Sequence, residues 1–262
     1  MKTALVLTGG GSKGAVEVGV LKVLSQSLIP DVFIGTSVGA LNAAVFLDGK
    51  DFSENILNLE RIWIGVSRKK IFPLNRRIFY KFHKIESLFS NRGLKKLVNE
   101  NLKAESFKDL VRPLYINCTK LSDGKSHYFY KGNLQDPIVA SCAISPFFEP
   151  VMINNSYYID GGHSNYLGLD KIRELRCDQV ILVNLGYHKQ SKEIKGILNM
   201  SYYVSEMMKR QLIMNSILSF KIKKLIEISP LLPEHLHITD FSQTEKLIKI
   251  GVREADKVLK KI

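Results

Sequence analysis

One serine of the chain lies in a setting that is typical of a nucleophile. Ser37 is the centre of the pentapeptide Gly35-Thr36-Ser37-Val38-Gly39, which follows the apolar stretch "VFI" and precedes the helical pattern "VGALNAAVFL". Glycines on both sides of a serine permit a sharp turn from a strand into a helix, and this turn lifts the serine Oγ out of the sheet. The flanking strand and helix favour this interpretation over a serine that only caps a helix. Ser37 is therefore the candidate nucleophile for attack on an ester.

A second glycine-rich turn, "LTGGGSKG" at residues 7–14, ends the first apolar stretch of the chain. Its spacing is not that of a P-loop, because Lys13 comes two residues after Gly11 and is followed by Gly14. It also lacks the acidic residue about 20 positions later that binds the ribose in dinucleotide sites. A serine that attacks an ester creates an oxyanion, which amides in such a turn can stabilise. We expect the amides of Gly10 and Gly11 to do so, since adjacent parallel strands would place both turns at one sheet edge. A turn that binds no ligand is the alternative.

A serine nucleophile needs a base, which is usually a histidine held by a carboxylate. The carboxylate that stands out is Asp160, which ends the apolar stretch "SYYID" and is followed by Gly161 and Gly162. This pattern is similar to the first two turns, although an ordinary Asp-Gly turn or helix cap has the same sequence. The histidines lie in polar or poorly defined segments, in a predicted hairpin strand, or directly after this turn: His83, His127, His163, His188, His235 and His237.

A histidine-dependent α/β-hydrolase is the alternative enzyme class, with His163 or His188 as the base. In that class the chain order is Ser, Asp, His, and the oxyanion loop carries HGGG after the third strand. Here the glycines follow the first predicted strand instead. This difference favours a base other than histidine, and single His→Ala variants would separate the two classes.

The motifs GGGSKG, GTSVG and DGG, in this order and spacing, resemble those of the patatin-like phospholipase family. The resemblance implies an acyl hydrolase with a Ser–Asp dyad and no catalytic histidine. Carried over by motif, it implies Ser37 as nucleophile, Asp160 as base, and an oxyanion hole formed by the turn Gly9-Gly10-Gly11 with Lys13. It extends over nearly the whole chain except roughly residues 50–105 and 187–230.

Two residues depart from the family pattern. Thr8 stands where plant members carry Asp before the glycines, and Gly168 stands where many bacterial members have proline. Neither departure touches the dyad, but the second leaves open the shape of the pocket rim.

The alternation of elements predicts an α/β fold: a three-layer α/β/α sandwich with a mostly parallel central sheet and a partly antiparallel edge. We expect it to form a single domain over residues 1–262. Strands are predicted near 3–8, 31–35, 113–119, 125–130, 150–159 and 179–185. Helices are predicted near 14–27, 37–47, 53–64, 86–101, 134–143, 169–176, 196–225 and 243–261.

The composition suits an enzyme without a metal. With 45% hydrophobic residues, 262 residues are enough to bury both faces of a parallel sheet. The three cysteines, Cys118, Cys142 and Cys177, have no C-x-x-C spacing, and the chain has no calcium-loop motif. We therefore expect no metal or other cofactor. An apolar leader and a run of 18 apolar residues are also missing, so the prediction is a cytoplasmic protein.

The formal charge of +13 is concentrated in two segments. Residues 61–103 contain 12 Lys and Arg against Glu86 and Glu100, and residues 189–226 contain 8 against Glu193 and Glu206. Such surfaces attract polyanions, and for a lipid acyl hydrolase the expected polyanion is an anionic bilayer at the inner face of the membrane. Nucleic-acid binding would explain the charge but not the three turns, and no nucleic-acid-binding module is recognisable.

The second basic segment is also rich in methionine. Met200, Val204, Met207, Met214 and Leu218 lie near one face of the predicted helix over residues 196–225. Flexible methionines suit an adaptable apolar surface, either a lid or a membrane contact. A helix that packs this face on its own sheet is the alternative. The ester cleaved, the acyl length, an acyl acceptor other than water and the oligomeric state are left open by these patterns.

Overall fold

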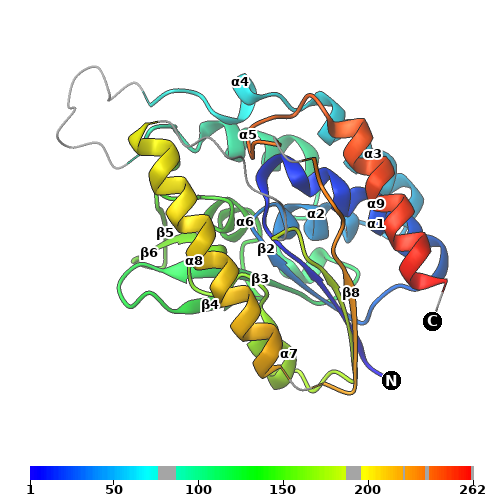
Figure 1. Cartoon of the computed structure of the whole chain (residues 1–262). Coiled ribbons are helices and arrows are strands. Elements are labelled where there is room, and N and C mark those ends of the chain that lie inside the picture. The colour runs from blue at the N-terminus through cyan, green and yellow to red at the C-terminus, as the bar shows by residue number, and fades with distance from the viewer. Residues whose placement is uncertain (76–86, 187–195, 221, 234–235, 261–262) are drawn as a thin grey trace.

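A mixed β-sheet forms the middle layer of the chain in its computed structural model, which describes residues 1–75, 87–186, 196–220, 222–233 and 236–260 (Figure 1). In the described part, eight strands are joined in the order β5-β6-β3-β2-β1-β7-β8, and β4 also pairs with β3. The strands are β1 (Thr3–Leu7), β2 (Val32–Thr36), β3 (Leu114–Lys120), β4 (Ser126–Phe129), β5 (Val151–Ile153), β6 (Ser156–Asp160), β7 (Gln179–Val183) and β8 (Lys224–Ile228).

The centre of the sheet is parallel and its edge is antiparallel, as the sequence predicts. Strands β3, β2, β1, β7 and β8 run parallel, whereas β4, β5 and β6 form antiparallel pairs. Every residue of β1, β2 and β7 is buried. Continuous burial explains their unbroken apolar sequences, because helices cover both faces of a parallel sheet.

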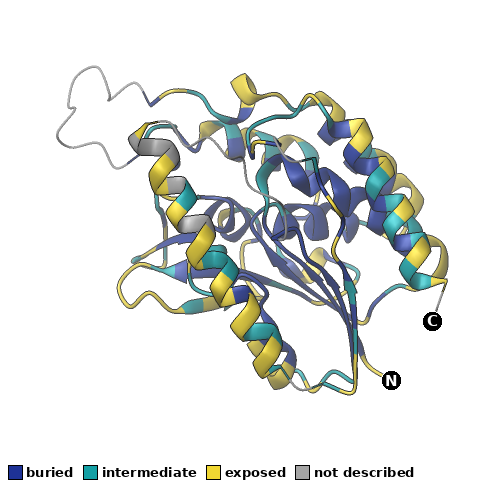
Figure 2. Cartoon of the chain, in the orientation of Figure 1, coloured by how far each residue is buried: buried dark blue, intermediate teal, exposed yellow. Residues whose placement is uncertain are grey.

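Helices form the outer two layers, so the three-layer α/β/α fold is confirmed (Figure 2). On one face, Leu5 and Leu7 pack in a core with α1, α2, α3 and α9; on the other, Ala4 and Val6 pack with α7 and with Ile213 of α8. The helices are α1 (Ala15–Ser27), α2 (Val38–Phe46), α3 (Phe52–Gly65), α4 (Arg68–Ile71), α5 (Arg92–Asn101), α6 (Gln135–Ser141), α7 (Leu169–Glu174), α8 (Ile197–Ser219) and α9 (Thr244–Leu259).

Two glycines let α9 pack directly on α1. A Cβ on Gly19 would lie 2.1 Å from the carbonyl oxygen of Ile248, and one on Gly251 would lie 2.0 Å from that of Val16. The helix backbones therefore touch where these glycines meet. This contact fixes the segment just before α9, which lies beside the first glycine-rich turn.

Strand β6 continues the line of β2 along β3. At Ile116, β3 has β2 on one side and β4 on the other, whereas at Cys118 its neighbours are β6 and β4. Strand β6 therefore occupies the side of β3 that β2 leaves after Thr36. Strands β2 and β6 run in opposite directions, so their C-terminal ends meet beside β3. This meeting places the turn after Thr36 next to Asp160.

Three predicted elements differ from the structure. The strand over 150–159 is a hairpin, because Asn154 and Asn155 adopt positive φ and turn the chain between β5 and β6. The helix over 196–225 ends at Ser219, and its last residues belong to β8, which the sequence interpretation missed. The helix over 86–101 begins only at Arg92.

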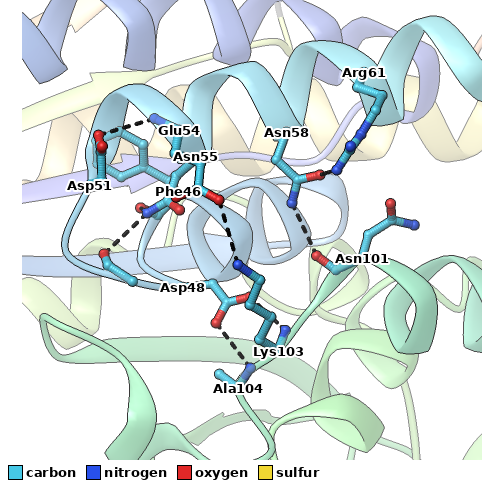
Figure 3. A network of polar contacts seen from close by, with 11 residues as sticks. Phe46, Asp48, Asp51, Glu54, Asn55, Asn58, Arg61, Asn101, Lys103 and Ala104 are labelled. Atoms are coloured by element: carbon cyan, nitrogen blue, oxygen red, sulfur yellow. Dashed lines mark hydrogen bonds and ion pairs between the residues drawn. The ribbon is translucent and has the colours of Figure 1, made fainter.

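A cluster of polar contacts joins the turn between α2 and α3 to the end of α5 (Figure 3). Asp51 caps the first turn of α3, and Asp48 accepts hydrogen bonds from the amides of Lys103 at 2.6 Å and Ala104 at 2.9 Å. We call it the corner network; its charged and amide side chains are Asp48, Asp51, Glu54, Asn55, Asn58, Arg61 and Lys103.

Candidate active site

Ser37 occupies a strained turn between β2 and α2. Its φ of 58° and ψ of −131° are rare for a residue with a side chain, and such strain often marks a functional position. The flanking residues must be glycines because a side chain at either position would clash with the backbone. A Cβ on Gly39 would lie 2.3 Å from the carbonyl oxygen of Leu7, and one on Gly35 would lie 2.4 Å from Ala40 Cα. The turn thus has the geometry expected of a nucleophile elbow.

The first glycine-rich turn lies directly beside this serine. A Cβ on Gly9 would be 2.8 Å from Ser37 Cβ, and the Gly9 carbonyl accepts a hydrogen bond from the Tyr166 hydroxyl. Gly11 has a φ of +57°, a conformation that glycine adopts without strain. Within the described residues, the amides of Gly10 and Gly11 have no hydrogen-bond acceptor. They can therefore donate to an oxyanion formed at Ser37.

Lys13 lies within the same turn but is buried. Its side chain is 2% exposed, and it is absent from the walls of both cavities that Ser37 lines, as far as the described residues define them. The adjacent Ser12 donates its amide to the Ile238 carbonyl at 2.8 Å and its hydroxyl to the His237 carbonyl at 2.9 Å. The predicted role of Lys13 in the oxyanion hole therefore stays a prediction.

Asp160 ends β6 with its carboxyl group buried next to Ser37. Oδ1 accepts a hydrogen bond from the Gly162 amide at 2.8 Å, whereas no described group completes a hydrogen bond to Oδ2. Burial raises the pKa of Asp160 above its ordinary value. Electrostatic interaction with His163, hydrogen bonding to the Ser37 hydroxyl and the Gly162 amide, and electrostatic interaction with Lys209 oppose this rise in pKa. The Ser37 hydroxyl is thus a neighbour of this carboxylate, in a contact that falls short of full hydrogen-bond geometry, as is common before substrate binds.

Two polar residues that the sequence interpretation missed hold the two turns together. Ser141 accepts a hydrogen bond from the Ser37 amide at 2.8 Å and donates to the Asn117 carbonyl at 2.7 Å. The Asn117 side chain donates to the carbonyls of Gly161 at 3.3 Å and Asn165 at 2.5 Å. Their signal in the sequence is weak: Asn117 directly follows the stretch Leu114-Tyr115-Ile116 of β3, and Ser141 directly follows the apolar run Ile138-Val139-Ala140 of α6. We call the set Ser37, Asn117, Ser141, Asp160 and Gly161 the site network.

Of the described histidines, one lies near Ser37 and Asp160. His163 is exposed, lines the same cavity as Ser37, and accepts a hydrogen bond from the Ser145 amide through Nε2 at 3.3 Å. His127 lies in β4, as predicted, and His237 lines a groove that Ser37 does not. His83, His188 and His235 lie outside the described residues.

Ser37 lines two cavities of different character. The outer cavity has a volume of about 410 Å³, and its walls include the polar side chains of Asp160, His163 and Lys209 together with Val204, Met208 and Leu212 of α8. The inner cavity has a volume of about 50 Å³ and almost entirely apolar walls. Gly11, Ser37 and Ile144 line both cavities, so the site can accommodate one polar and one apolar part of a ligand next to the serine.

The structure also places the remaining predicted features. The five residues of the methionine-rich face of α8 are between 46% and 81% exposed, so this face does not pack on the sheet (Figure 2). All eight described Lys and Arg residues of the segment 61–103 are exposed. In the described residues, no helix is long and apolar enough to span a membrane, and no three His, Cys, Asp or Glu side chains cluster as metal ligands.

The two departures from the family pattern have local explanations. The Thr8 hydroxyl donates to the Val183 carbonyl at 2.9 Å and accepts from the Leu185 amide at 3.0 Å, so it joins the ends of β1 and β7. Gly168 has a φ of +61° at the start of α7. Proline cannot adopt this angle, so the chain turns differently here.

Comparisons with known proteins identify relatives. A model of the family described as patatin-like phospholipase matches residues 5–170. "Patatin-like phospholipase domain-containing protein 7" of Mus musculus is 27% identical over 186 residues, which cover 70% of this chain and 13% of that protein. "Lysophospholipase nte1" of Aspergillus terreus is 27% identical over 183 residues, which cover 70% of this chain and 12% of that protein. The alignments thus span about an eighth of the length of these relatives.

A solved structure is also similar in part. The crystal structure of the type III effector protein ExoU aligns over 99% of this chain and 53% of that chain, with a TM-score of 0.44 and 14% sequence identity.

Proposed function

Because the chain belongs to the patatin-like phospholipase family, we propose that it hydrolyses carboxylic esters of lipids through an acyl-enzyme intermediate on Ser37. One observation carries the proposal. The strained elbow presents the Ser37 hydroxyl to a buried carboxylate, that of Asp160, beside the amides of Gly10 and Gly11, which donate to no acceptor among the described residues. The relatives named as phospholipase and lysophospholipase support a lipid ester as substrate.

In the proposed reaction, Ser37 Oγ attacks the ester carbonyl carbon while its proton passes to the Asp160 carboxylate. The carbonyl π electrons move to the oxygen, and the amides of Gly10 and Gly11 stabilise the resulting oxyanion. When the oxyanion collapses, the bond to the leaving alcohol breaks and Asp160 returns the proton to it. Water then repeats both steps on the acyl-enzyme, which releases the fatty acid and free Ser37.

The environment of Asp160 suits this role. An ordinary aspartate, with a pKa of about 3.9, is a weak acceptor for a serine proton at neutral pH. Burial raises the pKa of Asp160 and so makes it a stronger base. The side chain is 5% exposed, so water competes little for its carboxylate oxygens.

The surroundings of the site suit a phospholipid or lysophospholipid at a bilayer. Lys209 of α8 stands at the outer cavity, with its Nζ 4.9 Å from the centre of the Tyr166 ring, and its charge matches a phosphate on the leaving group. The exposed apolar face of α8 and the exposed basic residues of 61–103 suit contact with an anionic membrane. Binding to vesicles should then rise with anionic lipid content and fall with added salt, whereas hydrolysis of a small soluble ester should change far less.

Active-site labelling tests the function. A fluorophosphonate should label Ser37, and Ser37→Ala should abolish both labelling and ester hydrolysis while the protein keeps its melting temperature. His163→Ala is the matched control for the histidine-dependent alternative, and it should retain activity within about tenfold, or 1.4 kcal/mol of barrier. Activity should also persist in EDTA. Undiminished turnover by Ser37→Ala would refute the proposal.

A further inference from the structure

A buried polar network lies behind the first glycine-rich turn, outside the site network. Asn42 of α2 donates through Nδ2 to the Gly14 carbonyl at 3.0 Å and to Glu17 Oε2 at 2.8 Å, and its Oδ1 accepts from Trp63 Nε1 at 2.8 Å. A carbonyl only accepts and an indole N–H only donates, so these partners fix the orientation of the amide. We call the three buried side chains Glu17, Asn42 and Trp63 the rear network.

The rear network holds both ends of the glycine-rich turn. Gly14 lies at the end of the turn, and its carbonyl bonds to Asn42. Thr8 lies at the start of the turn. Burial raises the pKa of Glu17 well above its ordinary value, and hydrogen bonding to the Asn42 side chain and the Thr8 backbone opposes this rise. Only a donor lowers the pKa of a carboxyl group, so the Thr8 group is its amide. Residues 9–11 thus lie between two points that are tied to Asn42.

Helix α2, which carries Asn42, also begins at the nucleophile. Its first residue, Val38, directly follows Ser37, and Asn42 lies about one helical turn later. Packing supplements the hydrogen bonds, because a Cβ on Gly14 would lie 2.7 Å from Val38 Cγ2 and 2.8 Å from Trp63 Cζ2. Asn42 therefore connects the turn that carries the oxyanion donors to the helix that begins at the nucleophile.

Stability alone does not account for the rear network. Glu17 is fully buried, and within the described residues no group bonds to its Oε1. A buried carboxyl group of this kind costs stability, and apolar side chains of similar volume often stabilise a core at least as well. Hydrogen bonds are directional, however, whereas apolar contacts are not. The rear network can therefore fix the position of the turn at a cost in stability.

We propose that Asn42 is a positioning residue for the oxyanion hole, with Glu17 as its support. The proposal depends on the hydrolase function proposed above. An oxyanion at the substrate carbon bonded to Ser37 is stabilised only by donors that are already in place. Asn42 keeps the amides of Gly10 and Gly11 in place relative to Ser37. Both the formation and the hydrolysis of the acyl-enzyme pass through an oxyanion, so kcat depends on Asn42 whichever step is slower.

Kinetics of Asn42→Ala on a soluble p-nitrophenyl ester test the proposal. The kcat should fall about 10²-fold, because a displacement of about 1 Å has an effect of this size, while KM changes by less than about threefold. Asn55→Ala is the matched control, since the buried Asn55 side chain also donates to backbone carbonyls, those of Phe46 at 2.9 Å and Gly49 at 3.1 Å. This control should lower the melting temperature but keep kcat within about threefold.

Inhibitors distinguish an effect on the oxyanion from a general loosening of the fold. An alkyl trifluoromethyl ketone forms a tetrahedral adduct with Ser37 whose oxygen carries the negative charge, whereas the alcohol of the same chain length binds without reaction. In Asn42→Ala, the inhibition constant of the ketone should rise by about the factor by which kcat/KM falls, and that of the alcohol should stay within about threefold. In Asn55→Ala, both constants should stay within about threefold.

Conservative variants keep the proposal testable if Asn42→Ala does not fold. Asn42→Asp keeps the size of the side chain and the acceptor for Trp63 but loses the N–H groups that donate to Gly14 and Glu17. Its kcat should fall by at least about tenfold. Glu17→Gln keeps an oxygen that can accept from Asn42, so its kcat should be at least about tenfold higher than that of Glu17→Ala.

The outcomes separate the role of Asn42 from the hydrolase function on which it depends. Hydrolysis by Ser37→Ala at the wild-type rate would remove the function itself. If hydrolysis depends on Ser37 but folded Asn42→Ala and Asn42→Asp keep kcat within about threefold, the positioning role is refuted. Equal losses of kcat in Asn42→Ala and Asn55→Ala, or a rise in KM without a fall in kcat, would refute it as well.

Discussion

The site network and the corner network are both built from hydrogen bonds, but they serve different ends. In the site network, hydrogen bonds with Ser141 and Asn117 hold a strained backbone, and no group in the described part of the chain bonds to the buried atoms Asp160 Oδ2 and Asn117 Oδ1. In the corner network, Asp48 and Asp51 cap backbone amides in ordinary conformations near the surface (Figure 3).

The difference indicates how the chain distributes stability and function. Unpaired buried polar atoms and strained φ values cost stability, so the site network is held in place by the surrounding core. The corner network satisfies the ends of helices and adds stability directly. Substitutions in the first should therefore change mainly the rate of reaction, and substitutions in the second mainly the free energy of unfolding.

The largest effect is expected for Asp160→Asn. The change keeps the size of the side chain and removes its basicity, so kcat/KM should fall by at least about 10³-fold, close to the loss in Ser37→Ala. The double variant should be little worse than either single variant, because the two groups act as a unit. Steady-state kinetics on a soluble ester measure kcat/KM for the wild type, the two single variants and the double variant. Near-normal rates in Asp160→Asn together with an inactive His163→Ala would replace the dyad by a histidine triad.

A smaller but still large effect is expected for Asn117→Ala, which removes the bonds from the site network to Gly161 and Asn165. Misplacement of Asp160 by about 1 Å should lower kcat by about 10²-fold with little change in KM. Asn58→Ala in the corner network is the matched control, since its amide also bonds to a backbone carbonyl, at 3.2 Å. Equal kcat values for the two variants would show that Asn117 does not position the dyad.

The pH dependence of the reaction should report on the base. Asp160 must be ionised to accept a proton, so kcat/KM should fall by about tenfold for each pH unit below its pKa. Because burial raises that pKa, the midpoint should lie above the ordinary value of about 3.9. Glu17 has a buried carboxyl with a raised pKa outside the site network, so Glu17→Gln should leave the acid limb in place. A midpoint below 3.9 would contradict Asp160 as base.

Asp48→Ala should lower the stability of the protein and leave its activity nearly unchanged, in contrast to the variants of the site network. It leaves the amides of Lys103 and Ala104 without their acceptor, so the free energy of unfolding should fall by about 1–2 kcal/mol. Chemical denaturation measures the fall, and kcat/KM should stay within about twofold. A loss of activity without a loss of stability would mean that the two networks are coupled.

The smallest effect is expected for the ion pair between Lys103 and Glu54 in the corner network. The charged atoms lie 3.6 Å apart, and both side chains are largely exposed, at 82% and 69%. Water screens such pairs, so a double-mutant cycle should give at most about 0.5 kcal/mol of coupling. A coupling above 1 kcal/mol would show that the corner network is more rigid than its exposure indicates.

The features that were predicted correctly from the sequence are those that depend on residues close together in the chain. The turns at Gly9, Ser37 and Asp160 are strand-to-turn signals that depend on neighbouring residues, and the structure has each of them at the end of a strand. Strand β8 was missed because "KLIEI" is a short stretch that also continues the apolar pattern of α8. The hairpin of β5 and β6 was missed because its turn uses two asparagines at positive φ in place of glycine.

The sequence by itself thus determined the fold class, the glycine-rich turns and the three motifs on which family membership depends. Only the tertiary structure decided that β6 follows β2 along the same side of β3, which puts Asp160 beside Ser37. It also decided that the Asn117 side chain reaches the carbonyl of Gly161, 44 residues away. These contacts join segments far apart in the chain, and their geometry follows from strand pairing and helix packing rather than from local residue preferences.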